Sequence, residues 1–358
     1  MGEISKTTST GSGFTTTMAY KSYTNSLGQM TTVRKNPYYK YSPSVPGSVI
    51  FAVLFAIALV VMVGQVVYFC RKRTVMERTL LDGGGSAYGG GLADSSVKKE
   101  NTFESTESTT FVPVKPCTNT RLVTKFLPLL IGLGTECGGY IARIVSKKDV
   151  FAIGPYVAQT VMLLVAAAFM AATIYMNFGR LLVVMNATKV SFVPIRFSTA
   201  IFVTGDVVSI LLQAAGGAIL GTSDNDTLGS NIVIGGLAIQ VAIFGLFVIT
   251  EIRFLCLGDK VSPITACISR QWKVLNINLF VCSILILIRS IIRLIEFIQG
   301  YSGYIMVHEW FLFVFDGMVM ILVVVLFIGT FPKGNLFKVE FECTYMLKKP
   351  SYYAMRDA

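Results

Sequence analysis

The feature that most restricts the fold of this chain is a series of seven apolar runs, each long enough to cross a bilayer as a helix. A transmembrane helix needs about 20 apolar residues. The composition agrees, because 53% of the residues are hydrophobic and 14% are charged, against about 25% charged in soluble domains. The predicted spans cover residues 48–70, 123–145, 154–176, 198–221, 231–252, 275–298 and 307–330.

The predicted fold class is an all-α integral membrane protein, a bundle of seven transmembrane helices over residues 48–330. Barrel strands would instead show segments of about 10 residues in which every second side chain is polar. We expect residues 1–47, rich in Ser and Thr, to form a flexible extracellular tail. The Gly-rich residues 71–121 are expected to form a disordered cytoplasmic loop, and residues 331–358 a cytoplasmic tail.

The orientation follows from the basic residues, which give the chain a net charge of +11. Most of them lie in the odd-numbered loops and the carboxyl-terminal tail, so the positive-inside rule places the amino terminus outside and the carboxyl terminus in the cytoplasm. This pattern reports topology and gives no reason to expect nucleic acid as a partner. The sequon at Asn225 then lies outside, where it is a candidate glycosylation site. Glycosylation of Asn186 instead would indicate the inverse topology.

Polar residues inside the predicted helices recur at helical spacing. Ionisable groups at membrane depth cost about 2.5 to 3.5 kcal/mol each on insertion scales, so they normally face the interior of the bundle. Three groups share a helix face by their spacing of three or four residues. They are Glu136, Tyr140 and Arg143 in the second span, Asp206, Ser209, Gln213 and Gly216 in the fourth, and Arg289, Arg293 and Glu296 in the sixth.

The seventh span opens with the only histidine of the chain and carries two carboxylates. Glu309 and Asp316 are seven residues apart and would share a face of an α-helix, and His308 precedes them. We expect these three residues to complete one connected polar region that opens toward the outer leaflet and serves substrate binding or translocation. Buried ion pairs that only hold helices together are the alternative. His308 has no companion ligands, so we expect no metal.

Several motifs of enzymes and receptors do not occur in the sequence. It has no GxxxxGK[ST] phosphate loop, and no Ser or Cys nucleophile is placed beside the acids and the histidine. We therefore expect a protein that is not an enzyme and uses no catalytic residues and no cofactor. Transport by such a chain would be passive, driven by a gradient or dependent on a partner.

An ordered set of sequence blocks resembles one family. The blocks are "YSPS", "ECGGYIAR", "PYVAQTVMLL", "AATIYM", "FVTGDVVSILLQAAGG", "GGLAIQ", "RSIIRLIEF" and "HEWFLFVFD". Their order is similar to that of the RTA-like family, fungal seven-helix proteins described as lipid-translocating exporters. The resemblance implies a multi-pass plasma-membrane protein with an external amino terminus. It also implies functional positions at Glu136, Gly139, Tyr140, Arg143, Gln159, Asp206, Gln213, Gln240, Arg289, Arg293, Glu296, His308, Glu309 and Asp316.

The resemblance further implies membrane lipids as partners, above all sphingoid long-chain bases, and resistance to toxic lipids. A transporter of sterol-type or porphyrin amphiphiles is an alternative of the same class. A second alternative is a seven-helix lipid sensor or regulator that acts through its cytoplasmic loops. The sequence leaves the substrate, the direction, the energy source and the oligomeric state open.

Overall fold

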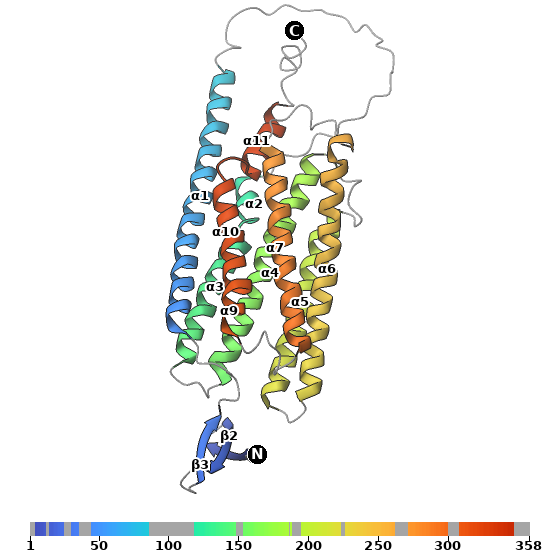
Figure 1. Ribbon diagram of the computed structural model, residues 1–358. Coiled ribbons are helices and arrows are strands. Elements are labelled where there is room, and N and C mark those ends of the chain that lie inside the picture. The colour runs from blue at the N-terminus through green and yellow to red at the C-terminus, as the bar shows by residue number, and fades with distance from the viewer. Residues whose placement is uncertain are drawn as a thin grey trace, which may run out of the picture.

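In a computed structural model, the chain is a bundle of long helices preceded by a small sheet (Figure 1). The structure describes residues 4–11, 14–24, 30–35, 44–85, 118–147, 153–185, 187, 195–222, 226–261, 271–299 and 308–346.

The sheet is antiparallel and has the strand order β1-β2-β3, formed by β1 (Ile4–Gly11), β2 (Phe14–Thr24) and β3 (Met30–Lys35). Its register pairs Ile4 with Lys21 and Ala19 with Lys35. The frequent Thr, Val and Tyr residues of these segments favour strands. We expected a flexible tail over residues 1–47, so these strands are a difference from the sequence prediction.

All seven predicted spans contain helix, and in five of them the helix extends beyond both predicted ends; in the spans 123–145 and 307–330 the helix begins later, at Leu127 and Glu309. The observed helices are α1 (Val45–Gly85), α2 (Asn119–Val123), α3 (Leu127–Ser146), α4 (Ile153–Val184), α5 (Ile195–Thr222), α6 (Asp226–Val261), α7 (Gln271–Gln299), α9 (Glu309–Phe311), the π-helix η3 (Leu312–Met318), α10 (Val319–Thr330) and α11 (Leu336–Met346). The all-helical membrane domain is therefore confirmed.

Six helical segments within the described residues are long and apolar enough to span a membrane, rather than the seven predicted. Five are parts of α1, α4, α5, α6 and α7, and the sixth joins η3 to α10. The remaining predicted span corresponds to α3, whose 20 residues include Glu136 and Arg143. The seven-span count and the orientation stay predictions.

Two boundaries predicted from the sequence need correction. The prediction of a disordered loop from residue 71 is wrong for the stretch up to Gly85, where α1 continues, and α2 begins before residue 121. Residues 86–117 lie outside the described part of the chain. The tail expected after residue 330 contains the helix α11, which packs against α1, α4 and α7.

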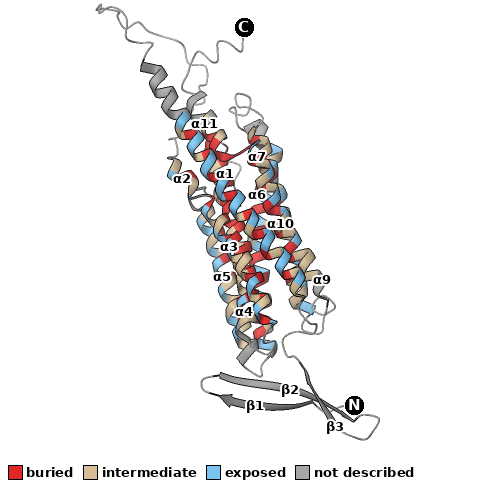
Figure 2. Cartoon of the chain, turned by 90° about the vertical axis from the view of Figure 1, so that its left-hand side faces the viewer, coloured by how far each residue is buried: buried red, intermediate tan, exposed pale blue. Residues whose placement is uncertain are grey.

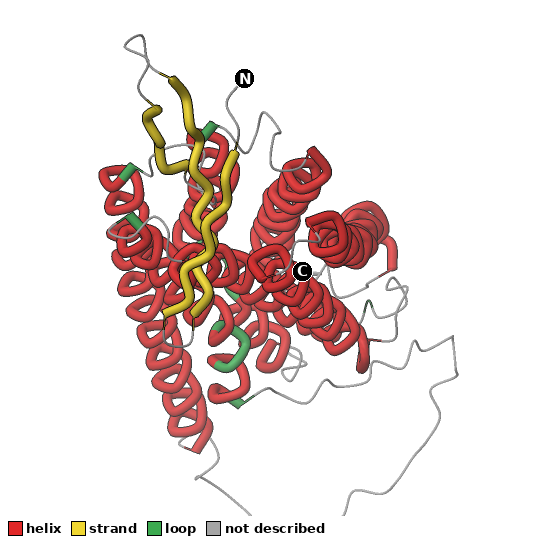
Figure 3. The backbone as a smooth tube through the Cα atoms, turned by 90° about the horizontal axis from the view of Figure 1, so that it is seen from below, coloured by secondary structure: helices red, strands yellow, loops and turns green. Residues whose placement is uncertain are grey.

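Helix α7 contacts α4, α6 and α10, while α1 contacts α3 and α10 (Figure 1). Seen from below, the helices lie side by side as one bundle (Figure 3). Aromatic rings fill the space between α4, α5 and α6, for example Tyr175 against Phe247, whose ring centroids are 4.6 Å apart. The helix faces that point away from the interior of the bundle are apolar and exposed, as at Val60 and Leu211 (Figure 2). Such faces suit lipid, because surface helices of soluble proteins turn charged and polar residues outward.

Candidate functional site

Asp316 lies on a π-helix in the segment where the sequence predicted a continuous α-helix. The segment runs as α9, then η3 with Asp316 near its end, and then α10. In a π-helix the backbone hydrogen bonds run from residue i to i+5, and such segments occur often at functional sites. The prediction that Glu309 and Asp316 share one helix face assumed α-helical turns over all seven residues between them. Because part of this segment is a π-helix, that assumption does not hold here.

The Asp316 carboxylate binds two arginines of α7. Arg293 donates from Nη2 to Oδ2 across 2.8 Å, and Arg289 forms an ion pair with Oδ1. The two arginines are one helical turn apart, so both reach the same carboxylate. Arg293 also donates to Glu296 across 3.1 Å, and Arg289 donates to the Leu163 carbonyl oxygen of α4, also across 3.1 Å. These bonds tie α7 to the π-helix and to α4.

Helix α3 adds the three polar residues that its spacing predicted on one face, and all three are buried. Glu136 and Tyr140 interact electrostatically with Asp316 and with both arginines of α7. The Arg143 guanidinium lies 5.4 Å from the centre of the Phe313 ring on η3. We define the Asp316 cluster as the residues Glu136, Tyr140, Arg143, Arg289, Arg293, Glu296 and Asp316. It contains three guanidinium groups and three carboxyl groups.

The aromatic wall of the Asp316 cluster comes from α1. Phe51 and Phe55 stack on the Tyr140 ring with centroid distances of 5.3 and 5.8 Å. The close approach of η3 needs Gly317, since a Cβ there would lie 2.5 Å from the Tyr140 hydroxyl oxygen and 2.7 Å from a Phe51 ring carbon. Small residues allow such contact between helices in a membrane.

Several buried polar atoms of the Asp316 cluster have no hydrogen-bond partner within the described part of the chain. Glu136 Oε1 and the Tyr140 hydroxyl oxygen are among them. Glu136 and Tyr140 are 1% and 0% exposed, so protein atoms exclude solvent from them. Buried polar atoms normally have a partner, and those without one call for an explanation such as a ligand or an ordered water.

A second buried polar group lies on α4, α5, α6 and α7, so the sequence prediction of one connected polar region does not match the contacts. Asp206 accepts a hydrogen bond from the Tyr175 hydroxyl across 3.1 Å instead of joining Asp316. On the same face of α5, Gln213 donates to Gln240 of α6 across 3.1 Å. This stripe of α5 is buried as its spacing predicted.

Glu251 of α6 belongs to this second group, and sequence reasoning missed it. It is 0% exposed and lies beside Ser283 and Cys282 of α7 and within electrostatic range of Tyr175. The signal was present, because Glu251 is a carboxylate within an apolar span. It was missed because no second ionisable residue at helical spacing drew attention to it.

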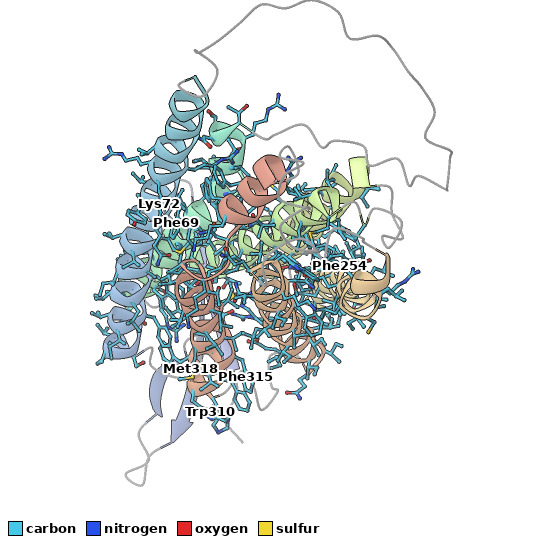
Figure 4. All side chains as sticks on the ribbon, turned by 90° about the horizontal axis from the view of Figure 1, so that it is seen from above. Phe69, Lys72, Phe254, Trp310, Phe315 and Met318 are labelled. Atoms are coloured by element: carbon cyan, nitrogen blue, oxygen red, sulfur yellow. The ribbon has the colours of Figure 1, made fainter. Side chains whose placement is uncertain are left out.

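The remaining predicted site residues lie at the edge of the site or outside the described side chains. His308 is half-buried immediately before α9. Glu309 begins α9, but its side chain lies outside the described part, as does the whole of Asn225. Trp310 and Met318 are exposed on the outer surface (Figure 4). The roles of His308, Glu309 and Asn225 therefore stay predictions.

Comparison with known proteins decides the family. The family model described as RTA1 like protein matches residues 129–340, which include α11 up to Glu340. The chain belongs to the RTA1-like family. This confirms the resemblance of the sequence blocks, and no solved structure matches the chain.

Curated relatives come from Saccharomyces cerevisiae. Protein RTM1 is 41% identical over 310 residues, covering 85% of this chain and 94% of the relative. Protoporphyrin uptake protein 1 is 40% identical, with 85% of this chain and 95% of the relative covered. Sphingoid long-chain base transporter RSB1 is 26% identical over 57% of this chain and 62% of its own length. Two of these three relatives are thus named as an uptake protein or a transporter.

Proposed function

We propose that this RTA1-like chain moves an amphiphile across the membrane, with a sphingoid long-chain base as the first substrate class. The observation that carries the proposal is that Glu136 Oε1 and the Tyr140 hydroxyl, which are among the buried polar atoms without a hydrogen-bond partner in the described part of the chain, lie beside the Arg289–Asp316–Arg293 contacts. Ionisable groups at membrane depth commonly mark substrate pathways. The names of two relatives support transport of an amphiphile.

The chemistry of a sphingoid base suits these two atoms. Its head group combines a cationic amine with hydroxyls, and its tail is a long hydrocarbon chain. The Glu136 carboxylate would accept hydrogen bonds from the ammonium, and Tyr140 would exchange a hydrogen bond with a hydroxyl. The Asp316 carboxylate is less suited to this role, because two arginines already bind it. The tail stays in the hydrocarbon, so the transfer needs no covalent step.

The test is movement of a labelled sphingoid base across liposomes that contain only the purified chain, without ATP. We expect the native chain to move the lipid and Glu136→Gln to move it about 10- to 100-fold more slowly, which corresponds to a charge-assisted hydrogen bond of about 1.5 to 3 kcal/mol. The matched control is Thr135→Val on the same helix, because the Thr135 hydroxyl bonds only to backbone oxygens of its own turn.

Two results would overturn parts of this proposal. Equal rates for native protein and a folded Glu136→Gln variant would remove Glu136 from the pathway. Saturable binding without movement by the native chain would favour the sensor hypothesis over transport.

A second substrate class has its own support in the arginines of the Asp316 cluster. Protoporphyrin is an amphiphile with two carboxylates, and the relative named for its uptake is 40% identical over 85% of this chain. Arg143 is buried beside the aromatic ring of Phe313, and guanidinium groups bind carboxylates in bidentate geometry. In the same liposomes, Arg143→Gln should reduce porphyrin movement more than sphingoid base movement if porphyrins are the substrates.

For localisation we propose the plasma membrane, with seven spans, the amino terminus outside and the carboxyl terminus in the cytoplasm. The distribution of Lys and Arg supports this orientation. Protease digestion of intact cells should remove an epitope fused to the amino terminus and leave one fused to the carboxyl terminus. The opposite pattern would invert the topology.

A further inference from the structure

Two carboxylic acids are buried in the second polar group, away from the Asp316 cluster. Asp206 of α5 and Glu251 of α6 are 3% and 0% exposed. Both carboxyl oxygens of Glu251 and Oδ1 of Asp206 are without a hydrogen-bond partner among the described residues. Buried polar atoms of this kind call for an explanation. We define the Glu251 group as the residues Tyr175, Asp206, Glu251, Cys282 and Ser283.

The groups that face these two acids come from α4 and α7, and none of them is cationic within the described part of the chain. Tyr175 of α4 interacts electrostatically with both acids and donates a hydrogen bond to Asp206. Cys282 and Ser283 of α7 lie beside Glu251. An ionised carboxylate is costly to bury without a positive partner, and its neutral form is not. We therefore expect Glu251 to carry a proton when the helices are packed in this way.

Aromatic packing around the Glu251 group favours a proton over a larger cation. The Tyr175 ring lies 4.6 Å from the Phe247 ring and 5.4 Å from the Phe202 ring, measured between ring centres. The described residues include no group of three or more His, Cys, Asp and Glu side chains that could hold a metal ion. A calcium ion needs about six to eight oxygen ligands, whereas a proton needs one acceptor. The proton is thus the cation that suits this site.

Helix α7 connects the Glu251 group to the Asp316 cluster. Ser283 and Arg289 are both buried on this helix, about 9 Å apart along its axis at 1.5 Å per residue. Arg289 binds Asp316 and also donates to the Leu163 carbonyl oxygen of α4, the helix that carries Tyr175. A movement of α7 that lets water reach Glu251 would therefore also move Arg289. Packed helices of this kind can carry energetic coupling between two sites.

We propose that Glu251 is a proton-binding site, which releases its proton when α6 and α7 separate and takes one up again in each cycle of amphiphile movement. The cycle rests on the transport function proposed above. On release, the O–H bond of the carboxyl group breaks, its electron pair stays on the carboxylate, and water accepts the proton; uptake from water reverses this step. Glu251 suits the exchange better than Asp206, whose carboxylate is hydrogen-bonded to Tyr175.

The first test asks whether Glu251 holds a proton, and it does not require transport. Infrared spectra of the purified full-length chain in phosphatidylcholine nanodiscs distinguish a protonated carboxyl group from a carboxylate. A free glutamate is ionised near neutral pH, so we expect Glu251→Gln to remove part of the protonated-carboxyl band there. The matched control is Thr250→Val, since the Thr250 hydroxyl donates to the Leu246 carbonyl oxygen of its own helix turn. An unchanged band in Glu251→Gln would overturn the proposal.

The second test measures movement of the labelled sphingoid base in liposomes that have the same pH on both sides, with protein-free liposomes as the background. If proton release limits the cycle, the rate of the native chain should rise by up to about tenfold per pH unit while the neutral carboxyl predominates. Thr250→Val should follow the native chain, and Glu251→Gln should be slow and lose this pH dependence.

The outcomes separate proton exchange from transport itself. Movement by the native chain with the same pH dependence in Glu251→Gln, or with none in either protein, would overturn the proton cycle and leave the transport function standing. No movement by the native chain at any pH would overturn the transport function and the cycle together, and the infrared result would still decide whether Glu251 holds a proton. Similar midpoints of thermal unfolding would verify that the variants fold.

Discussion

Arg293 donates to Asp316 across 2.8 Å, and this bond joins α7 to the π-helix η3. Arg289 binds the other oxygen of the same carboxylate, so one acid compensates two arginines that are 2% and 8% exposed. Both of these ion pairs between α7 and η3 therefore involve the same residue, Asp316.

Asp316→Asn should destabilise the protein strongly. The amide cannot balance two buried guanidinium groups, and breaking a buried ion pair from one side costs about 3 to 5 kcal/mol. The measurement is the free energy of unfolding in detergent. If the loss comes from the unpaired arginines, the same substitution should cost much less in an Arg289→Met/Arg293→Met background. An equal cost in both backgrounds would contradict the role of the ion pairs.

Glu251→Gln should not lower the free energy of unfolding, in contrast to Asp316→Asn, although Glu251 is as buried as Asp316. Among the described residues, the groups that interact with Glu251 are Tyr175, Cys282 and the Ser283 hydroxyl, and none of these three is cationic. A neutral amide of the same shape removes the cost of a buried charge and exposes no partner. We expect the free energy of unfolding to stay unchanged or to rise. A loss comparable to that of Asp316→Asn would indicate a cation next to Glu251.

Helical periodicity in the sequence was sufficient to predict which polar residues turn inward. The spacing of Glu136, Tyr140 and Arg143 gave the buried face of α3, and the spacing of Arg289 and Arg293 gave that of α7. The reason is that a continuous α-helix fixes direction by residue number, and an ionisable group in lipid has to face inward.

Other features could not be predicted because they depend on tertiary contacts. The stretch "LFVFDGM" has no local signal for a π-helix, and the seven-residue spacing before Asp316 assumed regular α-helical turns. The helix α11 follows the last apolar run and is anchored by Glu340, whose partner Arg180 lies 160 residues earlier. The division of the polar residues into two groups depends on which helices are neighbours in the bundle. The sequence of a single span contains no information about its neighbours.

Gly317→Ala should destabilise the contact of η3 with α1 and α3. The new Cβ would lie 2.5 Å from the Tyr140 hydroxyl oxygen, and overpacking of this kind costs about 1 to 3 kcal/mol. Gly329→Ala in α10 is the matched control, because no atom lies within 4 Å of its Cβ position. There the gain in helix propensity should stabilise the protein by up to about 1 kcal/mol. Equal effects of the two substitutions would contradict the close approach at Gly317.

Glu340→Gln should loosen α11 while the rest of the bundle stays folded. Arg180 donates from Nε to Glu340 Oε2 across 2.8 Å and from Nη2 to the other oxygen, a bidentate pair with Glu340 1% exposed. Arg180 retains 15% side-chain exposure, so solvent screening lowers the cost below that of a fully buried pair, to about 1 to 3 kcal/mol. Hydrogen–deuterium exchange should rise in residues 336–341 and stay unchanged in α7.

The other partner of this ion pair, Arg180, gives a graded test of the same anchor. Arg180→Lys should give an intermediate result, since an ammonium keeps the charge but loses the two parallel hydrogen bonds. Unchanged exchange in α11 for Glu340→Gln would show that aromatic packing, as between Phe337 and Phe126, holds the helix without the ion pair.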